Sequence, residues 1–519
     1  MNDKFEEALK SELKNEKTLS DNGAVMHATT GKALLDINFS VSSLRQADET
    51  TIEKKFAEAY FEDPLLAVKW LFFSRDVRGG MGERRLFRIC FSWLAGQKPE
   101  LAEKLLKLAP EYGRWDDLWM SELKRDLWKK ALDIIAAQLT ADLEAADAGK
   151  SVSLLAKWLP SVCTSSPKTK ALGRTIAADL GMTERQYRKT LSKLRAASKV
   201  VEVGISANKW SEVDYNAVPS LANIKYKNAF TKHDAARRQA WLESLARGDE
   251  GVKINSSTAF PCDIVHSYMT TAKQNYFDWR TLHIKADTAL EEMWKALPDY
   301  ASSDTGKTLC VVDSSGSMTV GVGGGGMQAI DVAFSLGIYT SEKLSGPYKD
   351  KYISFSNKPK YIDMSNCKTL ADKLALSYAE AECANTDLRK TMKLILDSAV
   401  NNNLKQEDLP STILILSDMH FDQGTTDWGE DKTLMREIAE MYKNAGYIVP
   451  KMAWWNISAN SRTVIPVQQM ENGCTLVSGF SPSVLKMALS SKLDPFEALV
   501  DQLSSERYAP VEAAFQECV

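Results

Sequence analysis

The chain has 519 residues, of which 44% are hydrophobic and 26% are charged, a balance typical of a globular protein with two or three domains. No apolar run reaches the ~18 residues of a membrane-spanning helix, and the first residues lack a secretion-signal pattern, so we expect a cytoplasmic protein without a membrane partner. Eight scattered cysteines without a Cys-x-x-Cys pair favour reduced thiols over disulfides or a zinc site.

The net charge of −3 conceals a regional imbalance. Between Ser151 and Lys253 the chain carries 18 Lys and Arg residues against 9 Asp and Glu residues, so the rest of the chain is acidic. Segregated charge of this kind indicates contact with a polyanion on one part of the protein.

Two regions are expected before residue 300. Residues 1–50 are polar, which predicts a loosely packed N-terminal arm. Residues 51–300 show the helical spacing of apolar positions nearly throughout, for example over residues 65–73 and 86–94. Successive helices joined by short turns predict an all-helical domain of stacked, repeat-like hairpins.

An arginine-rich turn separates the first two of these predicted helices. Residues 74–85 contain three glycines, which permit a sharp turn, and several arginines, among them Arg78 and Arg84. These two arginines are candidates for phosphate binding. The alternative is a helix junction whose arginines pair with Asp76, Glu83 or helix-end carbonyls, and both interpretations stay open.

A basic helix pair is predicted within residues 167–197. Its second helix starts at Thr183, with Gln186 at the position that completes a capping box. The expected buried face of this helix consists of Tyr187, Leu191 and Leu194. The candidate nucleic-acid contacts of the pair are Arg174, Arg185, Arg188, Lys189, Lys193 and Arg195.

A row of cations along one helix suits contact with successive phosphates, whether of RNA or of DNA. The two helices also have the spacing of a helix-turn-helix, which keeps DNA as an alternative. The competing interpretation is a solvated basic face, which is common on helices. Because the excess of Lys and Arg persists through Arg238, we favour a nucleic-acid contact.

Further along, an apolar run predicted to be a buried strand ends abruptly in polar residues. Asp313, Ser315 and Ser317 alternate after it, so their oxygens can face one small volume at the carboxyl end of the strand. Downstream, Thr386 precedes a helical pattern and Asp418 ends a second buried strand. A set of oxygen ligands suits Mg²⁺, or Mn²⁺ or Ca²⁺, rather than zinc.

Other interpretations of this stretch are less favoured. A phosphatase of the haloacid dehalogenase type needs a second Asp where Ser315 stands. A phosphate-binding loop over residues 306–308 needs a glycine at Ala301, and a strand follows where that motif requires a helix. Residues 313–317 could also form a solvated turn, and His420 is more often neither a ligand nor a base in an oxygen site.

From about residue 305 to residue 519, strands and helices alternate, which predicts a doubly wound α/β domain. The expected strands cover residues 309–312, 351–355, 360–364, 412–417, 449–455 and 475–478. The expected helices cover residues 327–344, 388–400, 434–444 and 483–489.

The five oxygen-bearing residues resemble the metal-ion-dependent adhesion site of von Willebrand factor A domains, whose pattern is Asp-x-Ser-x-Ser, a loop Thr and a later Asp. The resemblance implies that Ser315, Ser317 and Thr386 form the inner ligand shell and that Asp313 and Asp418 complete it. It also implies one open coordination position, which a protein partner's carboxylate fills.

The helical part resembles the uncharacterised relatives of the Ro (TROVE) ribonucleoproteins. The motifs that carry this likeness are R-D-x-R-G-G-x-G-E-R at residues 75–84, G-R-W-D-D-L at 113–118, L-A-K-W-x-P at 155–160, Y-R-K-x-L-S-x-L-R at 187–195 and V-P-S-L-A at 218–222. In Ro proteins, helical repeats close into a ring with the A domain as clasp, and the ring binds small structured RNA and the ends of misfolded RNA.

The resulting prediction is an α plus α/β protein with an arm (1–50), a helical Ro-like domain (51–300) and a von Willebrand A-like domain (305–519). No set of nucleophile, base and orienting group stands out in the sequence, so we expect a non-enzymatic RNA-binding protein. The alternative is a protein-interaction adaptor that works with a MoxR-type AAA+ ATPase, without RNA.

Overall fold

The computed structural model describes residues 17–119, 125–273, 282–301, 307–322, 326–382, 384–422, 433–457, 463–468, 473–489, 492 and 494–518. The chain divides into two compact units. The first contains the residues up to Ala67, Gly79–Met81 and Ser256–Ser505, and the second contains Val68–Arg78, Gly82–Asn255 and Glu506–Val519. These units are discontinuous in sequence, unlike the three consecutive segments 1–50, 51–300 and 305–519, because residues 17–67 and the described residues between Ser256 and Ser505 belong to the same unit as the sheet.

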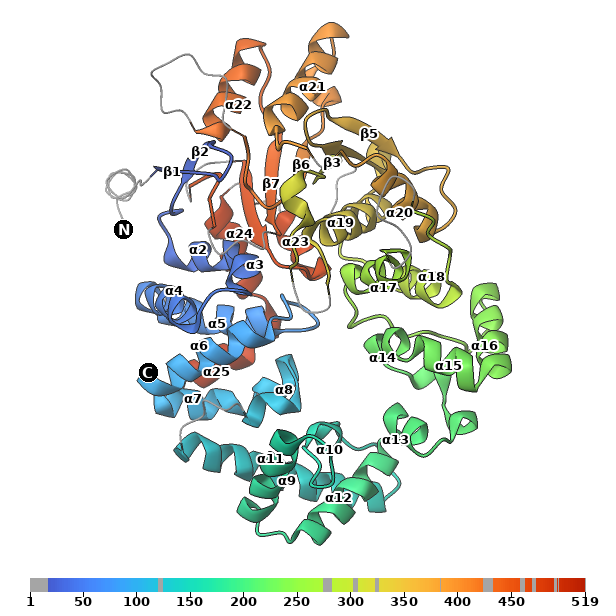
Figure 1. Ribbon diagram of the computed structural model, residues 1–519. Helices are drawn as coiled ribbons and strands as arrows, with labels where there is room; N and C mark the ends of the chain where they lie inside the picture. Colours follow the sequence, from blue (N-terminus) through green and yellow to red (C-terminus); the bar gives the residue numbers. More distant parts are fainter. Residues whose placement is uncertain are drawn as a thin grey trace. The chain divides into compact units, whose positions relative to one another are not determined.

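The first unit is built on a six-stranded sheet in the order β5-β4-β3-β6-β7-β8 (Figure 1). The strands are β3 (Thr308–Asp313), β4 (Lys351–Phe355), β5 (Lys360–Asp363), β6 (Thr412–Ser417), β7 (Lys451–Asn456) and β8 (Cys474–Ser478). All neighbouring pairs are parallel except β4 and β5, which are antiparallel. Every residue of β3 is buried, as expected for a central parallel strand whose side chains point to two covered faces. The six predicted strands and the α/β class of this part of the chain are confirmed.

Helices of the first unit surround this sheet. Beyond the N-terminal segment they are α17 (Pro261–Lys273), α18 (Thr288–Lys295), α19 (Ala329–Lys343), α20 (Leu370–Ala379), α21 (Leu388–Asn401), α22 (Leu434–Asn444), α23 (Leu485–Ala488) and α24 (Pro495–Leu503). Helix α19 lies against β3, β4 and β6. The approach is close because Gly337 has no side chain, and a Cβ there would lie 2.6 Å from Val312 Cγ2.

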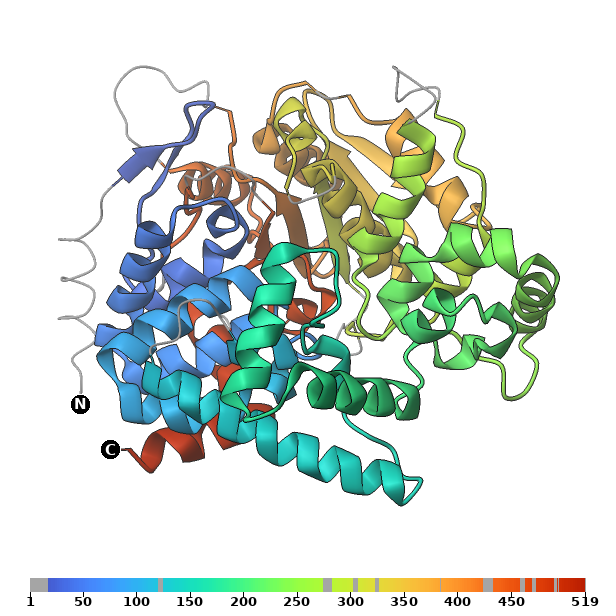
Figure 2. The ribbon, with the colours of Figure 1, turned by 60° about the horizontal axis from the view of Figure 1, so that its bottom comes forward.

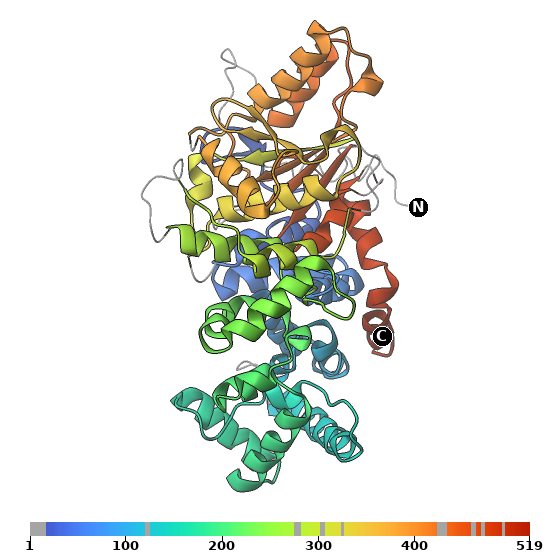
Figure 3. The same ribbon diagram turned by 90° about the vertical axis from the view of Figure 1, so that its right-hand side faces the viewer.

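The N-terminal segment is packed into this unit. It contains β1 (Lys17–Leu19), β2 (Val25–His27), α2 (Ala33–Phe39), α3 (Val41–Leu44) and α4 (Glu49–Glu62) (Figures 1 and 3). Leu35, Ile37 and Phe39 are completely buried. The Ser42 backbone N–H donates to Ser478 Oγ at the end of β8 over 3.1 Å. The expectation of a loosely packed arm is therefore wrong for residues 17–50, and residues 1–16 lie outside the described part of the chain.

Helix α5 (Pro64–Arg75) leads from the first unit into the second. The described helices of the second unit are α6 (Arg84–Gln97), α7 (Pro99–Leu106), α8 (Ala109–Tyr112), α9 (Arg125–Asp147), α10 (Leu155–Trp158), α11 (Pro167–Asp179), α12 (Glu184–Ala197), α13 (Val201–Ser206), α14 (Ser220–Lys225), α15 (Lys227–His233), α16 (Ala235–Arg247) and α25 (Ala509–Gln516). Figure 2 shows α9 as the long teal helix of this unit. Among the described residues, no helix has the length and apolar content needed to cross a bilayer.

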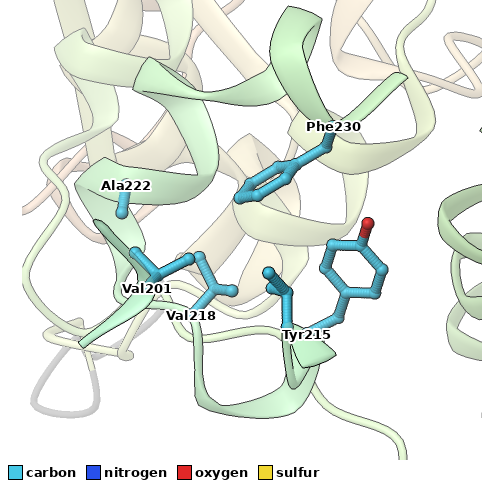
Figure 4. Packing of buried hydrophobic residues seen from close by; sticks show 6 residues of the cluster. Val201, Tyr215, Val218, Ala222 and Phe230 are labelled. Atoms are coloured by element: carbon cyan, nitrogen blue, oxygen red, sulfur yellow. The ribbon is translucent and has the colours of Figure 1, made fainter. Parts of the chain in front are cut away.

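Helices α13 to α16 and the turns between them share a small hydrophobic core. Phe230 is fully buried, and its ring lies edge-on to Tyr215 at a centroid distance of 5.4 Å (Figure 4). The guanidinium of Arg238 lies over the rings of Tyr215 and Trp241, 4.7 Å and 4.5 Å from their centroids. This buried arginine therefore belongs to the aromatic core rather than to an exposed basic surface.

Candidate metal centre and candidate nucleic-acid interface

The candidate metal centre lies at the carboxyl ends of β3 and β6. Asp313 is the last residue of β3 and is completely buried. Its Oδ1 accepts from the Ser315 backbone N–H over 2.9 Å, and its Oδ2 accepts from Ser417 Oγ over 2.6 Å. Because both oxygens are engaged, the carboxylate is held in one orientation at the rim of the sheet.

The two loop serines lie beside each other. Ser315 Oγ and Ser317 Oγ are 3.1 Å apart, so both hydroxyls face a common volume. The Gly316 backbone N–H between them donates to the Ala384 carbonyl over 2.9 Å, which attaches this loop to the segment that carries Thr386. The Asp422 backbone N–H donates in turn to the Thr386 carbonyl over 2.9 Å. The loops after β3 and β6 and the segment before α21 therefore meet at one edge of the sheet.

Asp418 is the second carboxylate at this edge. Its side chain is 4% exposed, and Oδ1 accepts from the His420 backbone N–H over 3.1 Å. Burial, together with the nearby negative charge of Asp418, raises the pKa of Asp313 to about 7. Two buried carboxylates thus lie close enough to repel each other.

The donor set fits a hard divalent cation. Within the described residues, no lysine or arginine pairs with Asp313 or Asp418, so their charge is uncompensated by a side chain. In the same part of the chain no three His, Cys, Asp or Glu side chains form a ligand cluster, and the other candidate donors are the hydroxyls of Ser315, Ser317 and Thr386. Carboxylates and hydroxyls without nitrogen or sulfur suit Mg²⁺, Mn²⁺ or Ca²⁺.

The sequence did not indicate two further residues of this edge. Ser417 orients Asp313, and its position directly before Asp418 was the available signal. Asn22 comes from the N-terminal hairpin, where its Nδ2 lies 2.7 Å from the His420 carbonyl oxygen and 3.5 Å from Thr386 Oγ1. No local pattern indicates a contact between residues separated by almost 400 positions.

The candidate nucleic-acid interface is centred on α12. The capping box of Thr183 and Gln186 is confirmed, as is the buried face of this helix, which consists of Tyr187, Leu191 and Leu194. The exposed cations of α12 are Arg185, Arg188, Lys189 and Lys193. Lys193 forms an ion pair with Asp147 over 2.5 Å, and Arg174 of α11 forms one with Glu184 over 2.9 Å. Exposed pairs of this kind are weak, so both side chains can exchange partners.

Arg195 does not belong to this exposed row. Its guanidinium donates to the carbonyls of Ala156 and Leu159 over 2.8 Å and 2.7 Å, and to Ser161 Oγ over 2.8 Å. Burial lowers the pKa of Arg195. Its side chain caps the last carbonyls of α10, so Arg195 does not extend the exposed row, and its contact with a nucleic acid stays a prediction.

Arg78 and Arg84 are also engaged within the protein. Arg78 donates to the carbonyl of Glu111 over 3.1 Å, near the end of α8, and Arg84 lies 3.7 Å from a carboxylate oxygen of Asp116. Their side chains are exposed, but the helix-junction interpretation describes their contacts better than phosphate binding does.

The two arginine-containing motifs of the helical part form one buried ionic cluster. Arg75, 2% exposed, donates through Nε to Asp117 Oδ2 over 2.8 Å, and Arg88 donates through Nε to Asp117 Oδ1 over 2.9 Å. A Cβ on Gly113 would lie 2.4 Å from Asp117 Oδ2 and 2.5 Å from Arg75 Nε. The motif at residues 113–118 therefore supplies the carboxylate of Asp117, and its Gly113 leaves the space that the guanidinium of Arg75 occupies.

Together these features define a protein with an all-helical unit and an α/β unit that carries a candidate site of oxygen donors. Residues 20–118 and 118–303 match a domain of unknown function (DUF2828), which spans more than half of the chain, and the chain belongs to this family. Residues 307–513 match a second domain of unknown function (DUF7788). The chain is also similar to "Uncharacterized protein L728" of Acanthamoeba polyphaga mimivirus, with 27% identity over 539 residues that cover 95% of this chain and 88% of the viral protein.

Proposed function

We propose that this protein is a non-enzymatic, Ro-like RNA-binding protein whose helical unit holds small structured or misfolded RNA. The observation that carries the proposal is the exposed row of Arg185, Arg188, Lys189 and Lys193 on α12. The helix beneath the row is firmly anchored by its buried face and its capping box. A rigid helix with several exposed cations suits contact with successive phosphates, because only the cationic side chains themselves have to become ordered on binding.

In this proposal the α/β unit is a von Willebrand A-like domain that binds a divalent cation, with Mg²⁺ as the first candidate. Asp313 and Asp418 would hold the ion together with the hydroxyls of Ser315, Ser317 and Thr386. The bound cation would offset the repulsion of the two buried carboxylates and would supply an open coordination position for a partner's carboxylate. By analogy with Ro proteins, this unit would act as a clasp or as a docking site.

The test of RNA binding compares two triple variants of the full chain. Replacing Arg188, Lys189 and Lys193 by Glu should reduce the nucleic acid that co-purifies with the protein and flatten the salt dependence of its retention. The control replaces three exposed cations of the first unit, Lys405, Arg436 and Lys443, by Glu, with the same change in net charge. Equal retention by both variants would show that α12 is only solvated.

Competition experiments separate RNA from DNA. Structured RNA should displace bound nucleic acid at lower concentration than duplex DNA of the same length. Equally strong competition by the duplex would favour the helix-turn-helix interpretation of α11 and α12 instead.

A second candidate function is an adaptor that docks on a partner such as a MoxR-type AAA+ ATPase, without RNA. The candidate site of oxygen donors favours it, because the resemblance to von Willebrand A domains implies an open coordination position that a partner's carboxylate can fill. Mg²⁺-dependent association with an ATPase that persists after nuclease treatment and in the α12 triple variant would support this function over the first.

A further inference from the structure

The N-terminal hairpin β1–β2 lies against the loop that carries Asp418. Ser20 Oγ donates to the Phe421 carbonyl over 2.5 Å, and the Ala24 backbone N–H approaches the same carbonyl at 3.4 Å. Antiparallel bridges join Gly23 to Asp422 and His27 to Ile465. The hairpin is therefore attached along its length to the edge of the sheet where the candidate ligands converge.

At the tip of this hairpin, the amide of Asn22 reaches two ligand-bearing segments at once. Nδ2 donates to the His420 carbonyl over 2.7 Å, two residues beyond Asp418. The same nitrogen lies 3.5 Å from Thr386 Oγ1, a long contact in which the hydroxyl oxygen accepts. A hydroxyl that accepts one hydrogen bond keeps a lone pair for a cation, so the contact orients Thr386 without blocking it.

His420 supplies an independent indication that this edge of the sheet can bind a polar group. Its ring is 1% exposed, and Nδ1 lies 3.2 Å from the backbone nitrogen of Asp21 and 3.2 Å from a carboxylate oxygen of the same residue. Nε2 has no hydrogen-bond partner in the described structure. Because an unsatisfied buried ring nitrogen is unfavourable, this position favours the binding of a polar group beside Nε2.

We propose that the hairpin β1–β2 supports the candidate metal centre and that Asn22 positions the loops that carry its ligands. This inference rests on the proposed cation binding. Asn22 holds the His420 and Thr386 segments in place. Binding of the cation therefore costs less conformational entropy. Linkage then requires the reverse effect: a bound cation must stabilise the attachment of the hairpin by the same free energy.

The first experiment measures Mg²⁺ affinity of the full chain by titration calorimetry. Asn22→Ala should bind Mg²⁺ about tenfold more weakly, the range seen when a residue behind a metal ligand is removed. Leu19→Ala is the matched control, because this residue is in the same hairpin and its side chain is half exposed, and it should bind like the wild type. Wild-type affinity in Asn22→Ala would overturn the proposal.

The second experiment needs no change in the hairpin and therefore remains decisive if Asn22→Ala does not fold. Hydrogen exchange of residues 20–24 in the wild-type protein should slow on addition of Mg²⁺ and should not respond in Asp313→Ala. If calorimetry shows Mg²⁺ binding but the exchange rates of residues 20–24 are the same with and without Mg²⁺, the proposal that the hairpin positions the site is wrong. If Asp313→Ala keeps wild-type Mg²⁺ affinity, the proposed cation site itself is wrong, which distinguishes the two failures.

Discussion

Removing the Asp117 carboxylate should destabilise the helical unit more than any exposed ionic substitution. Asp117 is fully buried and accepts hydrogen bonds from Arg75 and Arg88 and from the Arg114 backbone N–H, the last over 3.0 Å. In Asp117→Ala, the guanidinium of Arg75 stays buried without its partner. Breaking a buried pair in this way costs about 3–5 kcal/mol.

The expected shift in unfolding temperature follows from the size of the unit. The second unit has roughly 200 residues, for which each kcal/mol shifts the midpoint by about 2–4 °C. Asp117→Ala should therefore lower the midpoint by roughly 6–20 °C in scanning calorimetry. The control Asp116→Ala removes a partly exposed carboxylate and should cost about 1 kcal/mol or less.

A double substitution separates the lost charge partner from lost packing. Arg75→Met with Asp117→Leu removes both charges and should be more stable than Asp117→Ala alone, because the uncompensated guanidinium is gone. This account of the cluster would be refuted if Asp117→Ala lowered the free energy of unfolding by less than about 1 kcal/mol, or if the double variant were less stable than the single one.

Three further outcomes are expected. Asp313→Ala should abolish Mg²⁺ binding in calorimetry while the far-ultraviolet circular dichroism of the helices is retained; unchanged affinity would place the site elsewhere. Arg195→Met should lower the free energy of unfolding by about 2 kcal/mol in urea titrations, because three hydrogen bonds are lost, and should leave RNA retention unchanged; the opposite pattern would return this residue to the interface. Gly113→Ala should destabilise the helical unit by about 1–3 kcal/mol through the clash of its Cβ with Asp117 and Arg75, and wild-type stability would show that the cluster can shift.

The sequence predicted features that depend on neighbouring residues. The strand before Asp313 is recognisable because a buried parallel strand is apolar at every position, and the abrupt change to polar residues marks its carboxyl end. The capping box at Thr183 and the buried face of α12 depend on spacings of three to four residues, which the α-helix imposes on any sequence.

The sequence could not predict contacts that the tertiary fold creates. Arg195 directly follows the buried Leu194, so a helical pattern allows its long side chain to reach either solvent or α10, and only the position of the α10 carbonyls decides between them. Arg75 and Asp117 are 42 positions apart, and Asn22 and His420 are 398 apart. Such pairings depend on which helices and loops become neighbours, which hydrophobic spacing does not specify.

The packing of the N-terminal segment into the α/β unit has a consequence for biosynthesis. Ser42 and its partner Ser478 are separated by 436 positions. At translation rates of roughly 5–20 residues per second, the apolar residues of α2 wait on the order of 20–90 s for β8 to leave the ribosome. During that interval the apolar residues of α2 are exposed on the nascent chain. We therefore expect the N-terminal segment to bind a chaperone while the intervening helices are being synthesised.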